Sequence, residues 1–105
     1  MATNRISILK QMLEQNPGNS FAHYGLATEY ANSGQYEEAV NEFEALLTKD
    51  QSYVAAYYHG GQALEKLGRI DAARAFYQRG IEASKKKGDL HTRSELEAAV
   101  GLLPG

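Results

Sequence analysis

The stretch Gly34–Ala39 reads Gly-Gln-Tyr-Glu-Glu-Ala, and 34 residues later Gly68–Ala73 reads Gly-Arg-Ile-Asp-Ala-Ala. A glycine, a large apolar residue and an alanine therefore return at one fixed offset. A period of about 34 residues is typical of repeats built from two antiparallel helices. The sequence thus predicts stacked helical hairpins, with a tight, glycine-dependent turn inside each repeat.

The same offset also relates residues in both helices of the predicted repeat. It pairs Ala22 with Ala56, Tyr24 with Tyr58, Tyr30 with Leu64, Phe43 with Tyr77 and Leu47 with Ile81. One period earlier, it places Ile6, Leu9, Met12 and Leu13 under Val40, Phe43, Leu46 and Leu47. The residues up to Pro17 therefore match the second half of a repeat, so we expect the chain to start in the middle of one.

These positions resemble the tetratricopeptide repeat family. The first copy supplies His23, Leu26, Ala27, Tyr30, Gly34, Tyr36, Ala39 and Phe43, and the second supplies Tyr57, Gly60, Gly61, Leu64, Gly68, Ile70, Ala73 and Tyr77. The sequence departs from the pattern because it has no Trp, places Gly60 where Leu is usual, and keeps the closing proline only at Pro17. The resemblance implies an all-α, right-handed stack of antiparallel helical hairpins with about six helices.

We expect residues 1–105 to form a single domain of this kind. It divides into a half repeat over 1–17, a first repeat over 20–53, a second over 54–87 and a capping helix over 91–103. The expected helices cover about 4–15, 20–33, 36–48, 53–67, 71–87 and 92–102. A terminal helix of this sort is required physically, because an end repeat would otherwise expose its packing face to water.

Several residues are expected to fix local structure. Thr3 is the expected N-cap of the first helix, and Thr92 with Glu95 resembles a capping box that opens the last one. Gly34 and Gly68 are expected at positive φ, where glycine ends a helix without strain. The adjacent Gly60–Gly61 lower helix propensity, and they either allow a neighbouring helix to approach closely or simply loosen the helix.

Composition excludes several classes of function. The chain has 105 residues and no cysteine, so it carries no disulfide scaffold, thiol nucleophile or zinc ribbon. It lacks a signal-peptide-like apolar run and any stretch near the ~20 apolar residues of a membrane span, so we expect a soluble, cytoplasmic protein. The formal net charge of −2 argues against nucleic acid as a partner, although Arg69, Arg74, Arg79 and Lys85–Lys87 make the C-terminal half more basic.

Catalysis finds no support in the motifs of the chain. His23, His59 and His91 lie on different predicted helices without metal-ligand spacing, and no phosphate-binding glycine loop or nucleophile motif occurs. The acidic run Glu37–Glu44 is best explained as a solvated helix face. We therefore expect no enzyme activity, no metal and no cofactor.

Helical spacing separates a packing face from a groove face in the first helix of each repeat. The expected peptide-binding residues are Phe21, Tyr24, Thr28, Asn32, Tyr58, Gln62 and Lys66, with Ala55 and Glu65 on the same face and His59 at its edge. We expect Tyr24 and Tyr58 to stand side by side and anchor an extended or helical peptide. The alternative is that these tyrosines only pack helices together and that Phe21 staples a helix start.

The resemblance also implies the class of partner, a protein or peptide, but not its identity. The family uses concave grooves to bind proteins or peptides, and members that hold the C-terminal carboxylate of heat-shock chaperones carry Lys, Asn and Arg on this face. Here the matching positions hold Tyr24, Thr28, Tyr58 and Gln62, so the sequence favours an uncharged, more aromatic ligand segment. The alternative function is self-association as a structural homodimer.

Overall fold

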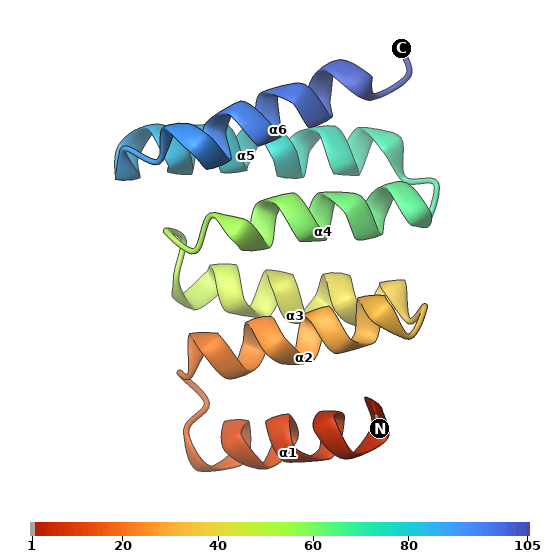
Figure 1. Cartoon of the computed structure of the whole chain (residues 1–105), viewed down its shortest axis with the longest axis vertical. Helices are drawn as coiled ribbons and strands as arrows, with labels where there is room; N and C mark the ends of the chain where they lie inside the picture. The colour runs from red at the N-terminus through yellow and green to blue at the C-terminus, as the bar shows by residue number, and fades with distance from the viewer. Residues whose placement is uncertain (1) are drawn as a thin grey trace.

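The computed structural model describes residues 2–105, and side chains from Asn4 onward. The helices are α1 (Ala2–Gln15), α2 (Ser20–Asn32), α3 (Tyr36–Lys49), α4 (Ala55–Lys66), α5 (Ile70–Lys87) and α6 (Leu90–Leu102). Figure 1 shows them stacked in chain order along the long axis, each running back against its predecessor. The expected all-α stack of helical hairpins is confirmed.

The two repeat turns have the same construction. Gly34 has φ of 79° and Gly68 has φ of 75°, so both predictions of positive φ are confirmed. In each turn the residue after the glycine donates its backbone N–H to a carbonyl in the last turn of the preceding helix. Gln35 N lies 2.8 Å from Tyr30 O, and Arg69 N lies 2.9 Å from Leu64 O. These bonds satisfy carbonyls that a helix end leaves unpaired.

The core follows the stack from end to end in two clusters. The main cluster joins α2 through α6 and holds the fully buried Phe43, Leu46, Leu47, Tyr77 and Leu96. A smaller cluster of Leu9, Ala22 and Leu26 fixes α1 against α2. Within the described residues α1 packs on α2 alone, whereas each later helix contacts at least two others.

Glycines let the two helices of the second repeat, α4 and α5, pack tightly against each other. A Cβ on Gly61 would come within 2.7 Å of Tyr77 Cζ, and one on Gly60 within 2.9 Å of Phe76 Cδ2. The structure therefore favours close approach over loosening for this pair. Gly80, which the sequence did not single out, does the same between Tyr57 Cβ at 2.5 Å and Leu96 Cδ1 at 2.9 Å.

Two expected helix caps were wrong. The first helix already begins at Ala2, so Thr3 lies within α1, and its side chain falls outside the described part of the chain. The last helix is capped by Asp89, whose carboxylate accepts hydrogen bonds from Thr92 N at 3.0 Å and Thr92 Oγ1 at 2.8 Å. Asp89 is therefore the N-cap and Thr92 is the residue that donates to it, because an Asp side chain at the N-cap satisfies a free backbone N–H at the helix start.

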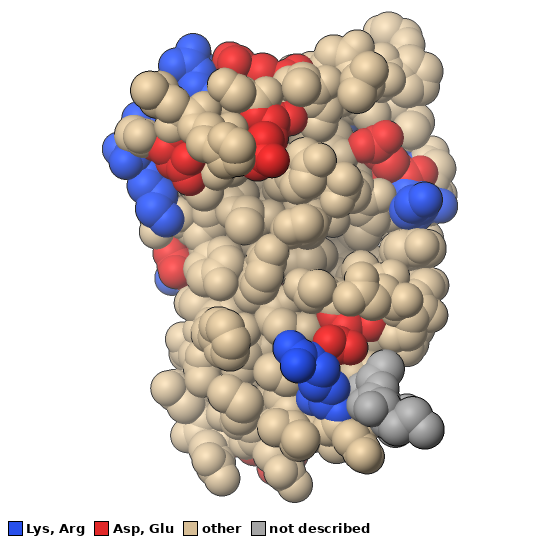
Figure 2. Space-filling view, viewed as in Figure 1, with Lys and Arg blue, Asp and Glu red and all other residues tan. Residues whose placement is uncertain are grey.

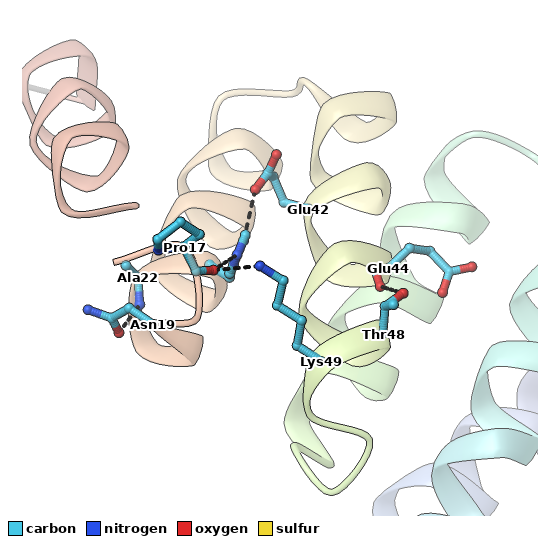
Figure 3. Close-up of polar contacts among 8 residues, drawn as sticks. Pro17, Asn19, Ala22, Glu42, Glu44, Thr48 and Lys49 are labelled. Carbon is cyan, nitrogen blue, oxygen red and sulfur yellow. Dashed lines mark hydrogen bonds and ion pairs between the residues drawn. The ribbon is translucent and has the colours of Figure 1, made fainter. Parts of the chain in front are cut away.

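A polar network ties the turn after α1 to the two helices that follow (Figure 3). The carbonyl of Pro17 accepts from His23 Nε2 at 3.0 Å and from Lys49 Nζ at 2.9 Å, and His23 Nδ1 lies 3.3 Å from Glu42 Oε1. Both partners of His23 are acceptors, so the two contacts form together when each ring nitrogen carries a proton. His23 thus joins the turn to α2 and α3.

Candidate functional site

A cavity of about 470 Å³ opens between α2 and α4, and we call it the central cavity. It is lined by Thr28, Ala31 and Asn32 of α2, by Tyr36 and Phe43 of α3, and by His59, Gln62, Ala63, Glu65 and Lys66 of α4. The first helices of two successive repeats therefore form its walls, and the second helix of the first repeat forms its floor. Its volume lies in the range of ligand-binding clefts, about 300–1,000 Å³.

Four of the seven predicted groove residues line the central cavity. Thr28, Asn32, Gln62 and Lys66 all face it, and the Thr28 hydroxyl donates to the Tyr24 carbonyl at 2.8 Å. Asn32, Gln62 and Lys66 are exposed, so their polar groups are free to meet a ligand. Spacing along α2 and α4 placed these residues because one face of a straight helix is set by its periodicity alone.

The predicted aromatic pair is arranged differently from the expectation. The Tyr24 ring packs on Tyr53 at 5.1 Å between centroids and on His59 at 5.8 Å. The Tyr58 ring meets His59 at 5.3 Å and Tyr77 at 6.3 Å. His59 is thus the ring beside both tyrosines, and the two tyrosines do not form a direct ladder. Each is half-buried against the core, which supports the helix-packing alternative for a large part of each ring.

Phe21 lies apart from these residues. Its side chain is 68% exposed in the first turn of α2, and it lines neither the central cavity nor the cavity beyond α4 described next. Helical spacing relates Phe21 to Thr28, but the central cavity opens nearer the C-terminal half of α2. Phe21 is therefore not among the residues that line the candidate site.

A second cavity, of about 280 Å³, continues the groove between α4 and α6, and we call it the cap cavity. Its walls are Tyr58, Gln62 and Glu65 of α4, Tyr77 of α5, and Glu95, Ala98, Ala99 and Leu102 of α6. Gln62 and Glu65 line both cavities, so the two are neighbours across α4. The sequence prediction missed this wall, although 95, 98, 99 and 102 follow the i, i+3, i+4, i+7 spacing of a single helix face.

Hydrogen bonding and burial set the state of the tyrosines around the groove. Burial raises the pKa of the Tyr24 hydroxyl, and the nearby Tyr53 raises it further. Burial and a hydrogen bond donated to Glu65 raise the pKa of Tyr77 strongly. Both hydroxyls therefore stay protonated at neutral pH, and the Glu65 carboxylate is an acceptor held in place at the boundary of the two cavities.

A larger cavity, about 660 Å³, lies elsewhere, between the 51–52 turn and α5. Arg79, Lys86 and Lys87 line it, and Figure 2 shows basic side chains along this edge of the stack. Two of these cations already have contacts within the chain: Arg79 lies 5.1 Å above the Phe76 ring and 3.3 Å from Glu44, and Lys87 donates to Ser52 O at 3.1 Å. Lysines in the last turn of α5 also oppose its dipole.

The described part of the chain holds neither a candidate metal site nor a membrane-spanning helix. Among residues 2–105 no three His, Cys, Asp or Glu side chains cluster where they could hold a metal ion. In the same range no helix is long and apolar enough to cross a membrane. The side chains that line the groove are aromatic rings, hydroxyls, amides and a few charged groups.

Comparisons with known proteins agree with this architecture. Residues 24–87 match the family model described as tetratricopeptide repeat. A tetratricopeptide repeat domain protein from Salinibacter ruber, solved by solution NMR, is 35% identical, with a TM-score of 0.77 over 86% of this chain and 95% of that one. A TPR repeat-containing protein of Pseudomonas aeruginosa is 25% identical over 88 residues, 84% of each chain.

A more distant structure shows the same fold with a ligand. PcrH, solved in complex with the chaperone-binding region of PopD, has a TM-score of 0.89 over 95% of this chain and 76% of its own. Its sequence is only 14% identical, so the likeness is one of fold alone.

Proposed function

Because the chain belongs to the tetratricopeptide repeat family, we propose that it binds a peptide segment of a partner protein in the groove formed by α2, α4 and α6. Domains of this family are protein-interaction modules and are generally non-catalytic scaffolds. The observation that carries this proposal is the central cavity between α2 and α4. It is open to solvent, partly aromatic, and edged by uncharged hydrogen-bonding side chains.

The lining of the central cavity suits an uncharged, aromatic or apolar stretch of ligand. Tyr36 and His59 offer ring surface, while Asn32 and Gln62 offer amide groups that can bond a peptide backbone. Its charged residues, Glu65 and Lys66, are adjacent in sequence and opposite in sign. The bound segment of PopD in the PcrH complex supports the view that a stack of this shape accommodates a peptide.

A selection experiment tests this proposal. Random 16-residue peptides displayed on phage are selected against the protein, and the enriched peptides are titrated by calorimetry. The double variant Asn32→Ala with Gln62→Ala removes two side-chain hydrogen bonds, which together stabilise binding by about 2 kcal/mol, so we expect the Kd to rise about 30-fold.

The matched control is Asn41→Ala with Gln78→Ala. It removes the same two side-chain types from exposed positions on α3 and α5 that line neither the central nor the cap cavity. We expect this control to bind as the wild type does. If no peptide is enriched, or if both double variants bind equally well, the groove is not the binding surface.

One observation favours self-association as a second function. Ile8 on α1 is 56% exposed, and in the described part of the chain α1 packs on α2 alone. A second copy could cover this apolar helix face. Sedimentation across a range of concentrations tests this: a dimer that the Ile8→Glu variant dissociates supports it, and a monomer at hundreds of micromolar removes it.

A further inference from the structure

The cap cavity differs in charge from the central cavity. Of the described residues that line it, Glu65 and Glu95 are charged and none is Lys or Arg. Figure 2 shows acidic side chains gathered in the upper part of the molecule, over α6 and its surroundings. The end of the groove at α6 is therefore negative, whereas in the central cavity Lys66 offsets Glu65.

The two carboxylates keep capacity for an external donor. Glu65 accepts one hydrogen bond from the buried Tyr77 hydroxyl, and an ionised carboxylate has about four acceptor positions. Glu95 lies 3.7 Å from His91 Nε2, but the His91 side chain is 87% exposed and makes only this loose contact. Among the side chains that the structure describes, no Lys or Arg is paired with either carboxylate.

Two further features of the cavity favour a cation. The half-buried Tyr58 contributes an aromatic ring, whose face attracts a guanidinium or ammonium group. The lining residues Glu65 and Leu102 stand in the last turns of α4 and α6. Figure 1 shows these two helices ending on the same side of the stack. The C-terminal end of a helix carries partial negative charge, so both dipoles add to the attraction.

The remaining lining suits the stem of a long basic side chain. Ala98, Ala99 and Leu102 form an apolar strip along α6, and Leu102 is 86% exposed. Lys and Arg bury their methylene stems on such surface while the charged head stays with polar partners. A cavity of about 280 Å³ is smaller than typical clefts for whole small molecules, so a single side chain is the fitting occupant.

We propose that the cap cavity is a subsite for one arginine or lysine side chain of the ligand segment, held between Glu65, Glu95 and the Tyr58 ring. This inference rests on the proposed peptide-binding function and assigns one position of the ligand. The segment is uncharged or aromatic over the central cavity and basic at the end that lies on α6. Helix α6 is then a wall of the groove as well as the cover of the last repeat.

The test uses two defined probes in an NMR titration of the 15N-labelled protein. One is the tripeptide acetyl-Leu-Arg-Leu-amide, and the other carries citrulline, which keeps the shape of arginine without its charge. We expect the arginine probe to shift the amide signals of Tyr58, Glu95 and Ala99 in a saturable manner. The citrulline probe should bind at least fivefold more weakly, and added salt should weaken only the arginine probe.

Charge-neutralising variants locate the effect. Glu95→Gln should weaken the arginine probe at least threefold, whereas Glu97→Gln, on the same helix with a side chain exposed to a similar extent, should not. Circular dichroism checks that both variants fold. Equal binding of the two probes, or equal effects of the two variants, overturns the assignment.

The outcome is separable from that of the proposed function. If selected peptides bind through Asn32 and Gln62 while the arginine probe shows no preference, only the subsite is wrong. If the arginine probe binds at the cap cavity but no peptide binds in the central cavity, the proposed function is wrong, and the cap cavity is left as an isolated cation-binding site.

Discussion

Replacing Gly61 by alanine is the sharpest test of how the second repeat packs. The new Cβ would lie less than 3.0 Å from three atoms of the Tyr77 ring, a distance that real Cβ atoms do not tolerate. That ring cannot move aside easily, because Tyr77 is fully buried and its hydroxyl is bonded to Glu65. Overpacking of a buried site costs about 1–3 kcal/mol, and this site belongs at the upper end.

Helix propensity acts in the opposite direction. Alanine is favoured over glycine by about 1 kcal/mol in a helix interior. Subtracting this from about 3 kcal/mol of overpacking leaves a net loss of about 2 kcal/mol. For a domain of this size, a loss of 1 kcal/mol lowers the Tm by roughly 4–8 °C, so we expect Gly61→Ala to lower the Tm by about 10 °C.

The chain supplies its own control in Gly101. This residue also lies within a helix, and a Cβ there would meet nothing within 4 Å. Gly101→Ala should therefore raise the free energy of unfolding by about 0.5–1 kcal/mol. Guanidinium unfolding followed by circular dichroism measures both variants, with the same slope expected for each because the unfolded surface is unchanged.

A double-mutant cycle identifies the clashing partner. In a Tyr77→Leu background the ring is absent, so Gly61→Ala should cost at least about 1 kcal/mol less than it does in the wild type. If Gly61→Ala is as stabilising as Gly101→Ala, or if its cost is the same with and without the Tyr77 ring, close packing is not the reason for the glycine.

Three other predictions follow from the helix ends. Deleting residues 91–105 removes the buried Leu96 and uncovers the faces of Gly80 and Tyr77. The Tm should therefore fall, or light scattering should show aggregation. A truncated protein that stays monomeric with an unchanged Tm would show that α6 is dispensable for stability. Gly34→Val and Gly68→Val force a branched residue to φ of 79° and 75°, so each should lower the free energy of unfolding by about 1–2 kcal/mol in chemical denaturation. An unchanged free energy would count against the turn assignment. Hydrogen bonds from Thr92 hold the pKa of Asp89 below its ordinary value of 3.8, so the stabilisation by this carboxylate is present above that pH and is lost as the pH falls through the lower pKa of the folded state. Asp89→Ala should therefore lower the Tm at pH 7, and its Tm should converge with that of the wild type in strong acid. A constant difference in Tm at all pH values would exclude the charged cap.

Much of the fold could be predicted because it depends on local rules repeated in register. The glycine turns, the apolar stripes and the 34-residue offset each point to the same hairpins. The expected bounds of α2 to α5 differ from the observed ones by no more than two residues. The errors lie at helix starts. There the choice of cap depends on which side chain reaches a free N–H. The capping-box pattern pointed to Thr92, whereas the side chain that caps α6 is that of Asp89.

The lining of the candidate site could be predicted only where it depends on one helix at a time. Spacing along α2 and α4 placed Asn32 and Gln62 correctly beside the central cavity. It could not show that His59 stands next to both Tyr24 and Tyr58, because ring contacts depend on how α4 crosses α2. It also could not show that α6 passes close enough to α4 to form a second cavity.

We propose that the groove of α2, α4 and α6 is the surface that binds a partner. Chemical-shift mapping of the 15N-labelled protein with a selected 16-residue peptide tests this. We expect the largest shifts on Thr28, Asn32, Gln62 and Lys66, extending to the α6 side of the groove. Shifts confined to α1, or to the exposed faces of α3 and α5, would contradict it.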